Sequence, residues 1–340
     1  MTGRTPLRIG FGTSGFGLSI DELIRLGTDA EGAGFDSFWV GENPREPWVS
    51  LAAVAEQTRR ITLGTGISSW ARSPVVTELA AADLDELSRG RLILGLGTGP
   101  LDRCESWHGL PTSRPARRMR EYVESLRLLW TAYDGRTVDF SGQLVQVHGY
   151  RRAIRPFRNR IPIYLGALGP AMIRMAGECC DGLLLDALTT TAYLHDRVAP
   201  SLSTGLALAQ RARETFDLGS VVLVAVDDNI EQAYALARPQ VADYLVGAQD
   251  LPLVELHGLQ AVVQALMDAS GRGSSQALND ALPDEVIDMF AVVGPRARCR
   301  DRLSAYVGLD FVVLWPTTTG LEPDQIRANV ANVLDAFAEA

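Results

Sequence analysis

Short apolar runs alternate with longer amphipathic segments along most of this chain. The run Leu-Ile-Leu-Gly-Leu at 92–96 has no polar position, which is typical of a parallel strand covered on both faces. The amphipathic segments repeat their apolar residues every three or four positions, as helices packed by one face do. Eight runs have the length and composition of strands: 7–11, 36–40, 60–66, 91–97, 161–165, 182–186, 220–226 and 310–315.

Eight strands, each followed by a helix, predict a (β/α)8 TIM barrel that forms one domain over residues 1–340. Insertions are expected after the fourth and the seventh strand. The first would hold a polar loop at 101–115, a helix at 116–133 and a hairpin at 134–148. A doubly wound open sheet is the alternative. The barrel is favoured because the first helix begins only near Ile20, well after the glycines that leave strand one.

The carboxyl ends of barrel strands meet on one face, where ligands bind. The loops after the strands place glycine, hydroxyl and aromatic groups there and few titrating ones. Gly97-Thr-Gly99 would let the backbone approach a flat or anionic group. The turn at 166–170 enters a helix, so its free N–H groups predict a phosphate site, although such turns are also common for structural reasons. The candidate residues are Gly12, Thr13, Glu42, Asn43, Ile67, Ser69, Thr98, Gly99, Ala167, Leu168, Gly169, Pro170, Asp186 and Trp315.

Composition excludes several functions. A net charge of −9 argues against a nucleic-acid partner. All 32 basic residues are arginine, so Walker-type phosphate loops, Schiff-base lysines and a pyridoxal phosphate anchor are ruled out. Four cysteines without CxxC spacing suggest a reduced, cytoplasmic protein. No apolar stretch is long enough to span a membrane.

Metal and hydrolase chemistry have little support. The four histidines lie far apart and form no HxH or HExxH motif, so no metal site is expected. His108 follows the fourth strand and could reach a substrate, although a surface role is the alternative. No Gly-x-Ser-x-Gly motif occurs. Glu42 and Asp102 are conceivable as a glycosidase pair, but loop orientation and helix capping explain them as well.

Several motifs together resemble the bacterial luciferase-like superfamily, and most closely its coenzyme F420-dependent branch, which includes methylene-tetrahydromethanopterin reductase. The motifs are Leu63-Gly-Thr-Gly-Ile67, Arg72-Ser-Pro74, Leu84-Asp-Glu-Leu-Ser-Arg-Gly-Arg91, Leu94-Gly-Leu-Gly-Thr-Gly99, 162–170, 176–178 and Asp181-Gly182. The resemblance implies a TIM barrel with an isoalloxazine-type ring at its mouth. It also implies a non-prolyl cis peptide between Gly66 and Ile67.

The resemblance also implies roles for single residues. Ile67 and Ser69 would contact the ring, and the 167–171 turn would bind the coenzyme phosphate. Glu42 and Asn43 would position ring or substrate, while Trp48, Trp70 and His108 would line the substrate pocket, and Arg72 or Arg103 could hold an anionic tail. The predicted catalytic residues are Glu42, Asn43 and His108, and the predicted coenzyme contacts are Gly12, Thr13, Gly66, Ile67, Ser69, Thr98, Gly99, Ala167, Leu168, Gly169, Pro170 and Ala171.

The chain departs from the family's sugar-phosphate dehydrogenases at decisive positions. Their Asp-His pair is Glu42-Asn43 here, and asparagine is no general base. Those enzymes carry a glutamate just after the Gly-Thr-Gly motif of the fourth strand, and this position is Pro100 here. Their phosphate-binding lysines are also missing from this chain. The expected activity is therefore hydride transfer between coenzyme F420 and a small organic substrate, reducing a C=N or C=C bond. The family resemblance also implies a homodimer. An FMN-dependent monooxygenase using oxygen and a non-catalytic flavin-binding barrel are the alternatives.

Overall fold

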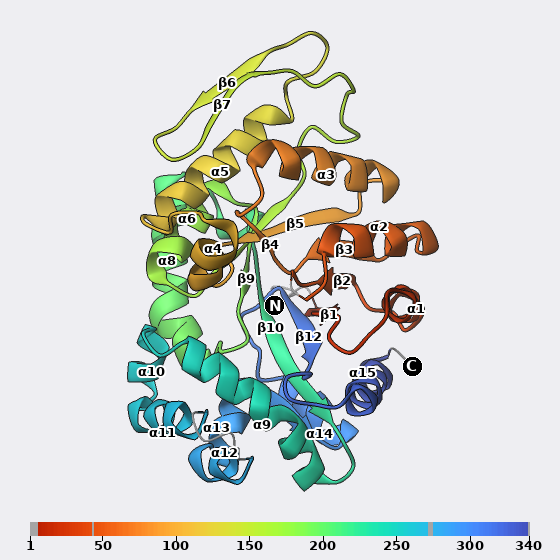
Figure 1. The fold of residues 1–340 in the computed structure, drawn as a ribbon, viewed down its shortest axis with the longest axis vertical. Helices are drawn as coiled ribbons and strands as arrows, with labels where there is room; N and C mark the ends of the chain where they lie inside the picture. Colours follow the sequence, from red (N-terminus) through yellow and green to blue (C-terminus); the bar gives the residue numbers. More distant parts are fainter. Residues whose placement is uncertain (1–5, 43, 271–274, 339–340) are drawn as a thin grey trace, which may run out of the picture.

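The computed structural model describes residues 6–42, 44–270 and 275–338, and its centre is a closed barrel of eight parallel strands (Figure 1). Strand pairing runs from the first strand around to the last, and pairing of the last with the first closes the ring, which confirms the predicted TIM barrel. The barrel strands are β1 (Arg8–Thr13), β2 (Ser37–Val40), β3 (Thr62–Thr65), β5 (Leu92–Gly97), β8 (Ile163–Gly166), β9 (Gly182–Leu185), β10 (Asp217–Val226) and β12 (Phe311–Pro316).

Helices surround the barrel, and several begin with a residue suited to a first turn. Ser19 and Glu22 form a reciprocal capping box at the start of α1, and proline occupies the first turn of α2, α3, α5, α6 and α15. The outer helices are α1 (Ile20–Gly32), α2 (Pro47–Gln57), α3 (Pro74–Leu87), α5 (Pro115–Leu129), α6 (Pro170–Cys179), α7 (Thr191–Tyr193), α8 (Ala199–Leu208), α14 (Arg296–Leu303) and α15 (Pro323–Phe337).

Large aromatic side chains fill the barrel where strands carry glycine. The Trp39 indole lies against Gly64, where an added Cβ would be 2.1 Å from the ring, and it stacks on Phe311 with centroids 6.2 Å apart. At the amino-terminal end of the barrel, Arg8 pairs with Asp217 at 2.8 Å, and the Tyr164 hydroxyl donates to the same carboxylate. The barrel is thus a packed core and not a pore.

Two segments connect barrel strands by longer routes. Between β5 and β8 lie α4 (Leu101–His108), α5 and the hairpin of β6 (Val138–Ser141) and β7 (Gln146–Tyr150), which projects away from the barrel (Figure 1). Between β10 and β12 lie α9 (Ile230–Gly247), α10 (Pro252–Leu256), α11 (Gln260–Ser270), α12 (Ser275–Ala281), α13 (Asp284–Phe290), β11 (Ala291–Gly294) and α14.

The sequence-based prediction of a loop at 101–115 is wrong for its first half, which is α4. Only Cys104 of this helix is buried, so its composition looks like that of a loop. The Trp70 indole donates to the Cys104 thiol at 3.3 Å, and the thiol donates to the Thr98 carbonyl at 3.1 Å. Strand β11 was also not predicted: it pairs in parallel with β10 within a stretch expected to be mainly helical.

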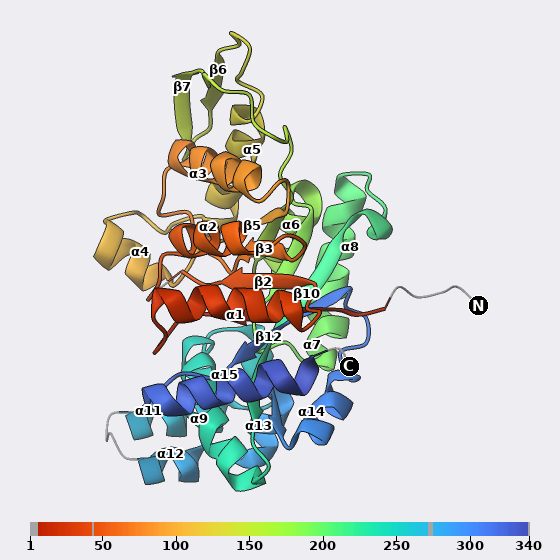
Figure 2. The same cartoon turned by 90° about the vertical axis from the view of Figure 1, so that its right-hand side faces the viewer.

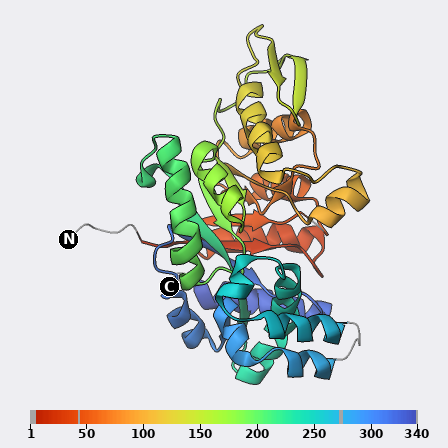
Figure 3. The ribbon, with the colours of Figure 1, turned by 90° about the vertical axis from the view of Figure 1, so that its left-hand side faces the viewer.

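Helices α4, α11 and α12 lie on the same side of the barrel, opposite the side from which the described chain enters its first strand (Figures 2 and 3). The arrowhead of β2 points toward that side in Figure 2, so these elements stand at the carboxyl ends of the strands. Throughout the described ranges, no helix combines the length and hydropathy needed to cross a membrane.

Candidate functional site

The Trp315 indole forms the centre of the barrel mouth. Trp315 lies in the last strand, β12, and its six-membered ring packs against backbone that carries no side chain. An added Cβ would be 2.4 Å from this ring at Gly12, 3.2 Å at Gly41 and 3.4 Å at Gly66. Gly12 is therefore covered by Trp315. Thr13 is buried, and its hydroxyl accepts from the Gly15 N–H at 3.0 Å.

The Gly66–Ile67 peptide bond is cis, as the family resemblance predicts. Its Ile67 side chain crosses the ends of the two next barrel strands. An added Cβ would be 2.9 Å from Ile67 at Gly97 and 2.8 Å at Gly166. Gly97 at the end of β5 and Gly166 at the end of β8 therefore make room for Ile67, which covers the strand ends where the ring is predicted to bind.

Glu42, two residues after β2, points toward this bulge. Its carboxylate accepts the backbone N–H of Ser69. Burial raises the pKa of the Glu42 carboxyl above its ordinary value, and the Ser69 hydrogen bond and the charges of Arg72 and His108 act in the opposite direction. A carboxyl group of this kind can hold a proton at a higher pH than a surface glutamate can.

The structure brings His108 near Glu42 but gives other predicted pocket residues packing roles. His108 is exposed at the end of α4. The Trp48 indole is buried and donates to Ser68 Oγ at 3.2 Å, and Trp70 is buried against α4. Arg72 pairs with Glu46 at 2.8 Å and stacks over Trp48.

Ser69, Thr98 and Gly99 lie together beside the bulge. Ser69 Oγ donates to the Thr98 carbonyl at 3.3 Å, and Gly99 adopts the left-handed conformation with φ 63°. An added Cβ at Gly99 would approach Ser69 Oγ at 3.6 Å, an ordinary contact distance. Asn43, the third predicted catalytic residue, lies outside the described residues.

The predicted phosphate turn at 167–171 leads from β8 into α6. Gly169 is the N-cap and makes no side-chain cap, and Pro170 follows it. The N–H groups of Ala171 and Met172 therefore face outward without a helical acceptor. The Tyr193 hydroxyl donates to the Leu168 carbonyl at 2.7 Å and so fixes the turn. This arrangement can bind an anion at the helix N-terminus.

Asp186 is a candidate from the sequence because it follows a strand, whereas Tyr244 is a polar residue that the sequence analysis did not name. Asp186 follows β9, and Tyr244 lies on α9 within the second long connection. The negative charge of Asp186 acts on the Tyr244 phenol and raises its pKa further than burial alone does. The position of Asp186 after the sixth barrel strand is visible in the sequence, but the approach of Tyr244 is not.

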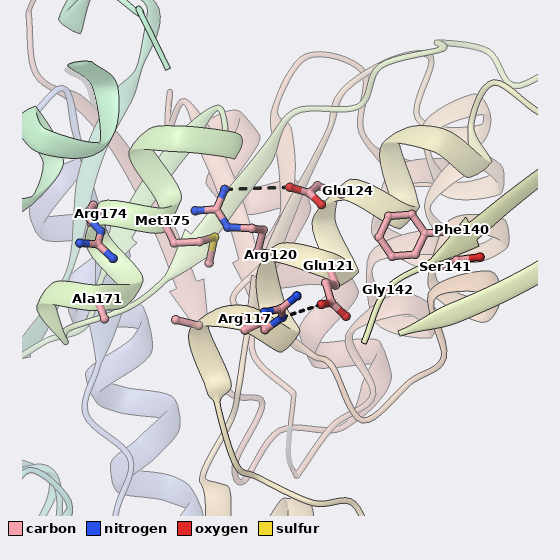
Figure 4. A pocket seen from close by; sticks show the side chains of 11 residues that line it. Arg117, Arg120, Glu121, Glu124, Phe140, Ser141, Gly142, Ala171, Arg174 and Met175 are labelled. Carbon is pink, nitrogen blue, oxygen red and sulfur yellow. Dashed lines mark hydrogen bonds and ion pairs between the residues drawn. The ribbon is translucent and has the colours of Figure 1, made fainter. Parts of the chain in front are cut away.

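A separate hollow of about 620 Å³ lies between α5, α6 and the β6–β7 hairpin (Figure 4). It touches the 167–171 turn only at Ala171. Its arginines are matched by acids: Arg117 pairs with Glu121 at 2.9 Å, and Arg120 contacts Glu124 at 3.9 Å. Within the described part of the chain, no group of three or more histidine, cysteine or acidic side chains is placed to hold a metal ion.

Comparison with known proteins agrees with this geometry. The family model described as luciferase-like monooxygenase matches residues 5–311. An uncharacterized protein of Mycobacterium tuberculosis is 35% identical over 289 residues, which cover 82% of this chain and 85% of that protein. The 5,10-methylenetetrahydromethanopterin reductase of Archaeoglobus fulgidus is 33% identical over 273 residues, covering 78% and 80%.

Among solved structures, the coenzyme F420-dependent tetrahydromethanopterin reductase of Methanopyrus kandleri superposes with a TM-score of 0.83 at 23% identity. The match covers 98% of this chain and all of that one. This likeness shows the shared barrel. The family model's match to residues 5–311 and the relatives at 35% and 33% identity establish that the chain belongs to the luciferase-like monooxygenase family.

Proposed function

We propose that this protein is an oxidoreductase that uses coenzyme F420 to transfer a hydride to a small organic substrate, reducing a C=N or C=C bond. The observation that carries the proposal is the position of Glu42: a desolvated carboxyl group lies directly beside the Gly66–Ile67 bulge that would support the coenzyme ring. The relationship to a methylenetetrahydromethanopterin reductase supports the same chemistry.

Different residues of the barrel mouth would bind the ring and the phosphate of the coenzyme. Ile67 would support one face of the ring, and the outward N–H groups at the start of α6 would hold the coenzyme phosphate. When bound, the reduced deazaflavin supplies a hydride. The protein's part is to orient the two reactants and to exclude water.

Glu42 would handle the proton that accompanies the hydride. Reduction of a C=N or C=C bond adds a hydride to one atom and a proton to the other. Because burial raises the pKa of Glu42, its carboxyl stays protonated further toward neutrality and can donate. The Ser69 N–H would then stabilise the carboxylate that remains.

An FMN-dependent monooxygenase is the second candidate, because the matching family is described as luciferase-like monooxygenase and a similar solved structure is a monooxygenase in complex with FMN. Titration of the protein with F420 and with FMN, followed by fluorescence, separates the two. We expect tight F420 binding and, in the absence of oxygen, oxidation of reduced F420 by an organic acceptor that carries a C=N or C=C bond. Tight FMN binding without F420 binding, together with oxygen uptake in the presence of reduced FMN, would overturn the proposal. A bound coenzyme that no reductant or acceptor changes would indicate a non-catalytic barrel.

A further inference from the structure

The hollow between α5, α6 and the β6–β7 hairpin is not used by the hydride transfer described above. Its volume is about 620 Å³, and residues of all three elements line it (Figure 4). Phe140 and Met175 supply apolar surface, and Arg117, Arg120 and Arg174 supply guanidinium groups. A space of this size, bounded by apolar surface and by three cations, is suited to a small molecule that carries negative charge.

The ion pairs of the hollow leave part of its guanidinium surface free. Arg117 donates to Glu121 through Nε at 2.9 Å, and Arg174 approaches Glu178 through Nε at 3.7 Å. Within the part of the chain that the structure describes, no residue accepts a hydrogen bond from the η nitrogens of Arg117 or Arg174. Both side chains are about half exposed, at 48% and 55%. Each guanidinium therefore presents its η nitrogens to a ligand.

The acids of the hollow are already engaged by the protein. Glu121 accepts the backbone N–H groups of Leu144 and Val145 at 2.6 and 3.0 Å, so it holds the hairpin in place. Arg120 donates to Glu178 at 2.5 Å, and Glu178 does not line the hollow. Three arginines and two glutamates form the lining, which gives it a charge of +1 in a chain whose net charge is −9.

The hollow begins where the predicted phosphate turn ends. Ala171 is the second residue of α6 and lines the hollow, and its N–H is one of the outward groups at the helix start. Arg174 lies three residues further along α6 and so shares a helix face with Ala171. Arg117 stands in the first turn of α5, which packs against α6. Negative charge that continues from an anion at the turn would therefore reach these arginines.

We propose that the hollow binds a polycarboxylate, a molecule with at least two carboxylate groups, through the free η nitrogens of Arg117 and Arg174. A planar guanidinium matches a carboxylate with two parallel hydrogen bonds. This chemistry has two sources. Coenzyme F420 carries a chain of glutamate residues beyond its phosphate, which would enter the hollow at Ala171. A free polycarboxylate would occupy the hollow without the coenzyme. The first source rests on the proposed function, and the second does not.

The first arm of the test compares F420 that carries its glutamates with F420 that lacks them, by fluorescence titration. We expect the wild-type protein to bind the glutamate-bearing form more tightly, by about fivefold for each exposed ion pair. R174Q and R117Q should each reduce this preference. R25Q removes an exposed arginine from α1 and should retain it. The preference should also weaken as the KCl concentration rises, because salt screens exposed charges.

The second arm uses isothermal titration of the coenzyme-free protein with citrate and with neutral glycerol. If the ligand is a free polycarboxylate, wild-type and R25Q bind citrate, R174Q and R117Q bind it about fivefold more weakly, and none binds glycerol. A preference for glutamate-bearing F420 without citrate binding assigns the hollow to the coenzyme. Citrate binding without that preference assigns it to a free anion.

Equal affinity of the wild-type protein for the two forms of F420, together with no citrate binding, would overturn the proposal. Binding that neither R117Q nor R174Q alters would also overturn it. R174Q changes a half-exposed side chain, and an unchanged Tm of this variant separates lost ligand contacts from lost structure. If neither form of F420 binds the wild-type protein, the proposed function fails, and the citrate titration then decides the hollow independently.

Discussion

Replacing Gly166 with alanine should displace Ile67 from the strand ends and weaken coenzyme binding. The added Cβ would lie 2.8 Å from Ile67 Cγ2, whereas carbon atoms pack at about 3.5–4.0 Å. Overpacking of this kind costs about 1–3 kcal/mol. If the displaced Ile67 no longer supports the ring, the same free energy corresponds to a loss of F420 affinity between about fivefold and about 150-fold.

The assay combines F420 titration with thermal unfolding. Unfolding entropy of about 2.1 cal/mol/K per residue converts 1–3 kcal/mol into a Tm decrease of about 1–4 °C for a chain of this length. G32A is the control, because an added Cβ there meets nothing within 4 Å and Gly32 ends α1. Adding I67A should reduce the Tm effect of G166A, since it removes the clashing atoms. Wild-type affinity and Tm in G166A would refute the steric argument.

Two further changes test the buried ion pair between Arg152 and Glu78 and the role of Glu42. R152A removes the 2.6 Å partner of Glu78, whose side chain is 0% exposed, and should destabilise the protein by about 3–5 kcal/mol, or roughly 4–7 °C in Tm. The double variant R152A/E78Q should unfold at a higher temperature than R152A. An unchanged Tm in R152A would contradict the expected destabilisation. We expect the wild-type kcat to fall as pH rises through the raised pKa of Glu42, because only the protonated acid donates, and E42Q should lower kcat and abolish this fall. A wild-type pH profile in E42Q would exclude Glu42 as the donor.

The barrel could be predicted from sequence because its strands are buried on both faces and so appear as uninterrupted apolar runs. The two errors arise where that signal is weak. Helix α4 buries only Cys104, so its residues give little amphipathic pattern. Strand β11 has only four residues, Ala291–Gly294, and lies between helices, so its apolar run is too short to distinguish from a helix end.

Prediction of the site depended on two different kinds of information. Position after a strand indicated Glu42, and the family resemblance indicated the cis bond at Gly66–Ile67, which the structure contains. Neither indicates the approach of Tyr244 to Asp186. These residues are 58 positions apart, and their proximity depends on the direction in which α9 crosses the strand ends, which the Gln240 hydrogen bonds to the β12 exit fix.

The glycines at the strand ends show how such a site can be misinterpreted from sequence. Gly97-Thr-Gly99 was expected to let backbone approach a flat or anionic ligand. The space at Gly97 is instead filled by Ile67, and the space at Gly12 by Trp315. Gly99 differs, because its left-handed φ requires glycine while its surroundings stay open enough for an ordinary contact. Most of these glycines therefore accommodate the two apolar side chains that form the floor of the mouth, and a ligand would contact those side chains rather than bare backbone.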